Sequence, residues 1–279
     1  MGVEERRNKK GNWNHEETRM EYEAIIVKKE GRVAALTMNR PEAMNYLDPL
    51  MAAEIEGALK DFENDEGVRV VVITGAGRAF SAGGDVKFMQ HDHPVHELVW
   101  RMERVTRFIK AMLDLPKPII ASVNGPAVGA GCNIALASDF ILASEKATFA
   151  QVFTRIGLIP DCGGVYLLPR RVGMTKAKEL ILTGRAIDAQ EAKEIGLVNR
   201  VVPAEALEGE TQKLAGEMAE GATMAIGIAK RLLNQTYESD LETILRAENS
   251  NQVLLRKAED HQEGVRAFFE KRKPEFKGR

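Results

Sequence analysis

Two short apolar segments that each end at glycine constrain the fold of this chain most. Residues 70–74 and 118–123 consist mostly of Val and Ile, and they stop at Gly75 and at Asn124-Gly125-Pro126. Apolar runs of this length are typical of strands that are buried on both faces. A helical pattern over residues 95–113 lies between them, and another strand-like segment follows at 140–143. This alternation predicts βαβ units, an α/β fold class and a largely parallel sheet.

The rest of the chain divides into two parts. Residues 24–38 predict two strands that break at Glu30-Gly31, and Asp48-Pro49 predicts a helix start, with the helix running to about residue 62. From about residue 175 helical patterns dominate, at 177–182, 204–220, 224–237, 241–257 and 261–271. We therefore expect an α/β core over residues 21–202 and a helical C-terminal region over residues 203–279. Residues 1–20 are polar and lack periodicity, which predicts a mobile N-terminal extension.

Composition excludes several classes of protein. The formal net charge of -2 provides no basic surface for nucleic acid, and no apolar stretch is long enough to span a bilayer. Cys132 and Cys162 do not form a disulfide framework or a zinc motif, so we expect a cytoplasmic protein in which both are packing residues. His91, His93 and His96 are closely spaced, but no Cys or acidic ligand set accompanies them, and we expect no metal site.

Two glycine-rich segments carry the features that point to a ligand. Residues 75–85 read GAGRAFSAGGD and residues 124–133 read NGPAVGAGCN, each at the end of a predicted strand. Small side chains let a ligand approach the backbone, and free N–H groups at a helix N-terminus suit an anion or a developing oxyanion. Neither segment fits the phosphate-binding loop or the dinucleotide-binding pattern. Tight turns of an α/β sheet would explain the same glycines without a ligand.

Several motifs occur in an order and spacing that point to a family. They are Asn39-Arg40-Pro41, FSAGGD at 80–85, ASVNGPAVGAG at 121–131, ASEKATF at 143–149, LTGR at 182–185 and GVRAF at 264–268. From about residue 22 to residue 276 the chain resembles the enoyl-CoA hydratase/isomerase (crotonase) family. The resemblance implies a crotonase-like spiral of ββα units with a helical C-terminal trimerisation region. It implies a homotrimer or homohexamer, and no cofactor apart from the coenzyme A of an acyl-CoA substrate.

The resemblance also implies where the substrate binds. Carried over by position, the backbone N–H groups of Gly84 and Ala130 form an oxyanion hole for the thioester carbonyl. Donors placed in this way stabilise the enolate that forms when an α-proton leaves, and one donor contributes about 3 kcal/mol. Ala82, Lys87 and Lys271 are the expected contacts of coenzyme A. An exposed lysine is the alternative for Lys87, and a solvated helix end is the alternative for Lys271.

The carboxylates predict the reaction. Family hydratases carry two glutamates where this chain has Asn133 and Phe153, whereas Asp161 lies in the segment IPDCGG at 159–164. Several family isomerases have an acid at that place, and the motif is most similar to the ring-opening isomerases of phenylacetyl-CoA catabolism. We expect Asp161 to move a proton from C2 to C4 of a 3-enoyl thioester. Alternatively, Asp161 only caps the following helix.

The sequence leaves open the exact reaction and the role of one polar residue, Asn133. This residue either hydrogen-bonds the substrate or a water, or it satisfies backbone groups near the start of its helix. Asp85 is expected to order its own turn rather than to act on the substrate. The competing functions are a hydratase with unusual groups, a hydrolase or dehalogenase with Asp161 as nucleophile, and a non-catalytic CoA-binding scaffold. Linear, dienoyl and aromatic-derived acyl groups are all compatible with the sequence.

Overall fold

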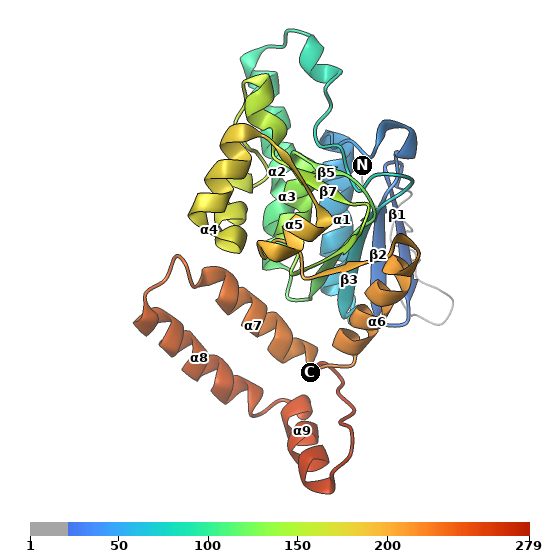
Figure 1. Ribbon diagram of the computed structural model, residues 1–279. Coiled ribbons are helices and arrows are strands. Elements are labelled where there is room, and N and C mark those ends of the chain that lie inside the picture. The colour runs from blue at the N-terminus through green and yellow to red at the C-terminus, as the bar shows by residue number, and fades with distance from the viewer. Residues whose placement is uncertain (1–21) are drawn as a thin grey trace, which may run out of the picture.

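The computed structural model describes residues 22–279, so the extension predicted over residues 1–20 lies outside the described residues. A six-stranded sheet with the order β1-β2-β3-β4-β6-β9 forms the centre of the molecule (Figure 1). Its strands are β1 (Ile25–Glu30), β2 (Val33–Met38), β3 (Val70–Gly75), β4 (Ile119–Val123), β6 (Phe140–Ser144) and β9 (Arg200–Val202). Only the β1–β2 pair is antiparallel, and all other neighbours in this sheet are parallel. The predicted α/β class and the largely parallel sheet are confirmed.

Both faces of the main sheet are covered by helices. On one face α1 (Pro49–Asn64), α2 (Val95–Asp114) and α3 (Ala130–Ala137) join the larger hydrophobic cluster. On the other face α6 (Leu207–Ala219) packs against β2, β3, β4 and β6. The start of α1 agrees with its prediction, because the Asp48 carboxylate accepts a hydrogen bond from the Met51 N–H at 2.9 Å. Burial on both faces explains why β3 and β4 are mostly apolar.

A second, three-stranded sheet positions one of the glycine-rich segments. It consists of β5 (Ala127–Val128), β7 (Thr148–Ala150) and β8 (Ala186–Asp188), with β5 parallel and β8 antiparallel to β7. The pairing of Ala127 with Phe149 fixes the segment that leads into α3. These strands contain only two or three residues each, which is too short for a periodic pattern to reveal them.

The segment after β7 contains the longest departure from the sequence prediction. A 3-10 helix, η3 (Val152–Ile156), is followed by a loop and then by α4 (Gly164–Thr183), of which only residues 177–182 were predicted. Helix α4 is interrupted at Gly173, whose φ of 75° and ψ of 161° are not helical, and it contains Pro169. These two residues resemble helix-ending signals in the sequence. The remaining short elements are η1 (Pro41–Ala43), η2 (Phe88–Gln90), η4 (Ala204–Ala206) and α5 (Ala189–Glu194).

The C-terminal helices extend from the core (Figure 1). Helix α7 (Thr223–Gln235) lies near α2, α8 (Leu241–Leu255) turns back alongside α7, and α9 (Glu259–Glu270) follows α8. All three helices were predicted. Although the sequence places α6 in the helical C-terminal part, this helix packs on the sheet, so the projecting region begins at α7. Within residues 22–279, no helix combines the length and apolarity that crossing a bilayer requires.

Candidate active site

The two glycine-rich segments meet in the structure. Ser81 and Ala127 form a parallel bridge, and the Val128 N–H donates to the Ser81 carbonyl at 2.9 Å. A Cβ atom on Gly131 would lie 2.3 Å from the Ser81 carbonyl oxygen, and one on Gly83 would lie 2.7 Å from the Val128 carbonyl oxygen. The small residues are therefore required by the contact between the two segments.

Two main-chain donors lie at this meeting point. The position of a Cβ atom on Gly83 is 3.3 Å from the Ala130 nitrogen, so the turn before Gly84 is adjacent to the start of α3. Within residues 22–279, neither the Gly84 N–H nor the Ala130 N–H donates a hydrogen bond. Ala130 is the first residue of α3, where the N–H has no acceptor in the helix and the helix dipole favours negative charge. These donors could hold a carbonyl oxygen that gains charge.

Asn45 supports the first turn, and sequence reasoning missed it. This residue is fully buried, and its Nδ2 donates to the carbonyls of Ala76 at 2.9 Å and Ala79 at 2.8 Å. Its own carbonyl accepts from the Ser81 hydroxyl at 2.7 Å. Asn45 has a φ of 54°, a conformation that Asn tolerates better than most residues. Its contacts are distant in sequence, so no local pattern indicates them.

The residues after Gly84 form a turn that closes on itself. The Asp85 carboxylate accepts hydrogen bonds from the N–H groups of Lys87 at 3.0 Å and Phe88 at 3.2 Å, as expected for a residue that orders its own turn. Lys87 is exposed, and the Ala82 N–H donates to the Met44 carbonyl at 2.8 Å. Contact of Lys87 and Ala82 with coenzyme A stays a prediction.

His93 belongs to an aromatic stack. The centroid of its ring lies 3.8 Å from that of the Phe88 ring at an interplanar angle of 11°. The Arg101 guanidinium lies 3.8 Å from the centroid of the Phe88 ring. The His93 Nδ1 atom is 3.6 Å from the Glu97 carboxylate. Within residues 22–279, no group of three His, Cys, Asp or Glu side chains comes together as a metal site would require.

Asp161 lies in the loop between η3 and α4. Its side chain is partly buried, and Oδ1 is inaccessible to solvent without a hydrogen-bond partner among the described residues. Burial raises the pKa of this carboxyl above its ordinary value, although the neighbouring Cys162 thiol opposes the shift. The carboxylate does not cap α4, because the Gly164 N–H donates to the main-chain carbonyl of Asp161 at 2.9 Å. The side-chain capping alternative is therefore not what the structure shows.

Asn133 has an exposed fraction of 0% and uses both polar atoms of its side chain inside the protein. Its Nδ2 donates to the Asp161 carbonyl at 2.8 Å, and its Oδ1 accepts from the Gln151 Nε2 at 2.7 Å. The backbone group that it satisfies lies in the Asp161 loop rather than at the start of its own helix. Gln151 is buried too, and nothing in the sequence indicated this role.

The other predicted positions are further apart. Phe153 is buried, and its ring lies 3.5 Å from the position of a Cβ atom on Gly129, next to the Ala130 N–H. Lys271 caps the end of α9, which is separated from α3 by α7 in Figure 1. Within one chain, Lys271 therefore lies apart from Gly84 and Ala130.

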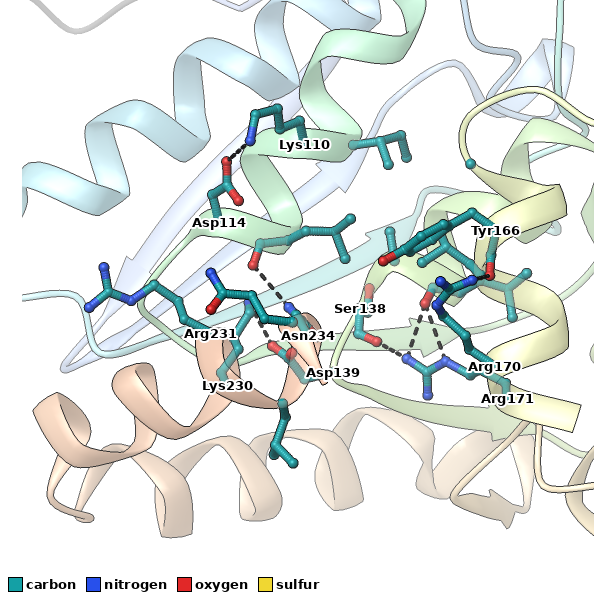
Figure 2. A pocket seen from close by; sticks show the side chains of 18 of the residues that line it. Lys110, Asp114, Ser138, Asp139, Tyr166, Arg170, Arg171, Lys230, Arg231 and Asn234 are labelled. Atoms are coloured by element: carbon teal, nitrogen blue, oxygen red, sulfur yellow. Dashed lines mark hydrogen bonds and ion pairs between the residues drawn. The ribbon is translucent and has the colours of Figure 1, made fainter. Parts of the chain in front are cut away.

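A large cavity lies away from these residues. It has a volume of about 1020 Å³, is bordered by α2, α4 and α7, and is lined by none of the residues predicted to be catalytic or CoA-binding. Figure 2 shows that some of its charged groups pair within the protein, with Lys110 on Asp114 at 2.6 Å and Lys230 on Asp139 at 2.8 Å. Arg171 donates to main-chain carbonyls at the end of α3.

Comparison with known proteins identifies the family of this chain. The profile of the enoyl-CoA hydratase/isomerase family matches residues 28–279. A 1,2-epoxyphenylacetyl-CoA isomerase of Escherichia coli K12 is 39% identical over 92% of this chain and 99% of its own length. A crotonyl-CoA hydratase of Syntrophomonas wolfei is 39% identical over the same shares. The crystal structure of an enoyl-CoA hydratase from Bacillus anthracis has a TM-score of 0.88 at 36% identity, covering 92% of this chain and all of its own. The two glycine-rich turns with their free main-chain donors lie on this fold. From the profile match and these relatives, the chain belongs to the enoyl-CoA hydratase/isomerase family and has the crotonase fold.

Proposed function

We propose that this protein is an enoyl-CoA isomerase in which Asp161 moves a proton between carbon atoms of the acyl group. The observation that carries the proposal is the inaccessible Oδ1 of Asp161, which has no partner among residues 22–279. Burial raises the pKa of this carboxyl, so it can exchange a proton with carbon nearer to neutral pH than an exposed carboxyl can.

The proposed reaction conserves every atom of the substrate. The N–H groups of Gly84 and Ala130 hold the thioester carbonyl of a 3-enoyl-CoA. The Asp161 carboxylate takes a proton from C2, and the electrons of that C–H bond move to the carbonyl oxygen as a dienolate. The protonated carboxyl then returns the proton to C4, and the double bond settles between C2 and C3. The two main-chain donors act on the oxyanion, where one donor is worth about a hundred- to thousandfold in rate.

The residues at positions 133 and 153 support an isomerase over a hydratase. Addition of water requires groups that orient the water and transfer protons, and these contribute about a hundred- to ten-thousandfold. The Asn133 amide is engaged by Asp161 and Gln151, and Phe153 has no acid or base. A hydratase remains the alternative, because a crotonyl-CoA hydratase and an isomerase are equally similar to this chain.

The remaining parts of the proposal concern the substrate and the assembly. The acyl group is a linear enoyl, a dienoyl or an aromatic-derived ring, carried on coenzyme A that Ala82, Lys87 and Lys271 contact. We propose a cytoplasmic homotrimer or homohexamer that associates through the C-terminal helices. Two exposed aromatic side chains on α9, those of Phe268 at 79% and Phe269 at 78%, suit such an association. Sedimentation of the purified protein measures the assembly.

The test is a spectroscopic assay at the absorbance band of the conjugated enoyl thioester. We expect absorbance to grow with a 3-enoyl-CoA, to stay flat for Asp161→Asn, and to be retained by Glu145→Gln, a matched change of an exposed acid. Loss of the band from a 2-enoyl-CoA, at a rate above that of isomerisation, would identify a hydratase instead. CoA binding without turnover of either substrate would identify a scaffold. An ester on Asp161, seen by mass spectrometry after rapid quench, would identify nucleophilic chemistry.

A further inference from the structure

A chain of two buried side-chain amides connects α3 to the loop that carries Asp161. The Gln151 Nε2 donates to the Asn133 Oδ1 at 2.7 Å, and the Asn133 Nδ2 donates to the Asp161 carbonyl at 2.8 Å. The exposed fractions of Asn133 and Gln151 are 0% and 2%. Because α3 begins at Ala130, this connection joins the helix that presents an oxyanion donor to the loop that presents the carboxyl.

The Asp161 carbonyl, the last group in this series of hydrogen bonds, fixes which atoms donate and which accept. A main-chain carbonyl can only accept, so Asn133 must point its NH2 group at Asp161 and its oxygen at Gln151. Gln151 must then donate its own NH2 group. An acid at position 133 would place a carboxylate oxygen against the Asp161 carbonyl, where a donor is needed. The amide at 133 is thus matched to the loop in chemistry as well as in size.

The loop requires such a restraint. Cys162 has a φ of 45° and Gly163 has a φ of 77°, so two left-handed residues follow Asp161 directly. A non-glycine residue in this region is strained, and it persists where surrounding contacts hold it. The Asp161 carbonyl accepts from both Asn133 and the Gly164 N–H, which fixes the peptide that enters the strained turn.

Helix α4 packs closely against the Asn133 amide. A Cβ atom on Gly164 would lie 2.5 Å from the Asn133 Nδ2 and 2.7 Å from its Oδ1. The first turn of α4 therefore contacts the Asn133 side chain directly.

We infer that Asn133 is a positioning residue, held by Gln151, that fixes the strained Asp161–Gly163 turn and thereby directs the Asp161 carboxyl at the substrate. The inference rests on the proposed function, since it concerns the residue that moves the proton. It assigns Asn133 no contact with the substrate. The Asn133 Nδ2 and the Gly164 N–H hold the main chain beneath the carboxyl, and this main chain sets the direction of the side chain.

The test compares Asn133→Ala with Ile134→Val. Ile134 is the neighbouring buried residue, and its side chain takes no part in the hydrogen bonds that link Gln151, Asn133 and Asp161. For Asn133→Ala we expect kcat to fall about tenfold or more, which corresponds to the loss of one buried hydrogen bond. We expect KM to stay within about twofold of the wild-type value. The acid limb of the kcat/KM profile should move to lower pH, because a released carboxyl regains water. Among the described residues, the Cys162 thiol is the only other side chain that shifts the pKa of this carboxyl, and it lowers it.

Gln151→Leu provides a second variant if Asn133→Ala does not fold. It leaves the contact between Asn133 and Asp161 but removes the donor that orients Asn133, so we expect an effect in the same direction and of smaller size. Wild-type kcat and an unmoved acid limb in both folded variants, with Asp161→Asn inactive, would overturn the inference while the proposed function stands. A lower melting temperature with an unmoved acid limb would overturn it too. Activity in Asp161→Asn would instead overturn the proposed function.

Discussion

Lys230 on α7 is buried and forms an ion pair with the partly buried Asp139, in which Nζ lies 2.8 Å from Oδ2. The same ammonium donates to the carbonyls of Met112 at 3.0 Å and Lys117 at 3.1 Å, so one side chain attaches α7 to the ends of α2 and β4. Burial lowers the pKa of Lys230, and the charge of Asp139 opposes that shift. The first of the projecting helices is therefore attached to the core by a charged group rather than by apolar packing alone.

Lys230→Ala should lower the free energy of unfolding by about 3 kcal/mol, because it leaves Asp139 and two carbonyls without their cation. Urea unfolding at neutral pH measures the change. Arg246→Ala, which removes an exposed ion pair with Glu242, is the matched control and should change stability by less than about 0.5 kcal/mol. Equal effects of the two substitutions would contradict the attachment of α7 by Lys230.

Gly131→Ala should abolish activity, because its Cβ atom would lie 2.3 Å from the Ser81 carbonyl oxygen and would separate the two glycine-rich turns. We expect a loss of about a hundredfold or more in kcat, equivalent to the loss of one oxyanion donor. Gly216→Ala in α6 meets nothing within 4 Å and is the control. It should preserve activity and raise stability by about 0.5–1 kcal/mol, since alanine favours the helix.

Asp161→Asn should make the protein more stable at pH 7 while it removes activity. The pKa of the folded carboxyl is raised above its ordinary 3.8, so the protonated form is favoured in the folded state. The stability that this shift contributes is present at low pH and is lost as pH rises through the folded pKa. Melting temperatures of the two proteins should therefore differ at pH 7 and converge as the pH falls towards 3.8. A constant difference across this range would show that the carboxyl is not desolvated.

Asp260→Ala should release the C-terminal segment. The Asp260 carboxylate accepts hydrogen bonds from the N–H groups of Lys277 at 2.6 Å and Gly278 at 2.8 Å, and Arg69 donates to the Phe276 carbonyl at 3.0 Å. Loss of the buried carboxylate should cost about 1–3 kcal/mol. Limited proteolysis followed by mass spectrometry should show cleavage after residue 271 in the variant before the wild type is cut.

The two thiols should be unreactive in the folded protein. Cys132 and Cys162 are both buried, and burial raises the pKa of Cys132 to about 12 and that of Cys162 well above its usual value. Because the thiolate is the reactive form, a colorimetric thiol reagent at about pH 8 should react with neither until denaturant is added. Fast reaction of one thiol in the native protein would mean that its surroundings open locally.

Much of the core could be predicted because its signals are local. Strands β3 and β4 are mostly apolar runs that stop at or just before a glycine, and the start of α1 carries both an N-cap aspartate and a proline. Strands β5, β7 and β8 could not be predicted, since their two or three residues gain order only by pairing with each other across distant parts of the chain. The first part of α4 was missed because Pro169 and Gly173 are typical of helix ends.

In the candidate site too, residues with local signals were predicted and residues with distant partners were missed. The glycine-rich turns were predicted from their own residues, and the carboxyl of Asp161 from a family resemblance. The amides of Asn45 and Gln151 were missed, because their partners are carbonyls and side chains that only the folded chain brings within reach. For Asn133, the sequence left open whether the amide faces the substrate or the backbone, and the structure points it at the Asp161 carbonyl.

The two glycine-rich turns supply main-chain donors, which a substitution rarely removes, whereas the proposed base is a side chain, which a substitution replaces. The N–H groups of Gly84 and Ala130 belong to the main chain, and only proline lacks such a group. Most substitutions at those positions would leave the donors chemically intact, whereas one codon change at Asp161 removes the proposed base. On the proposed function, such a scaffold would keep its hold on the thioester while the reaction that follows diverges.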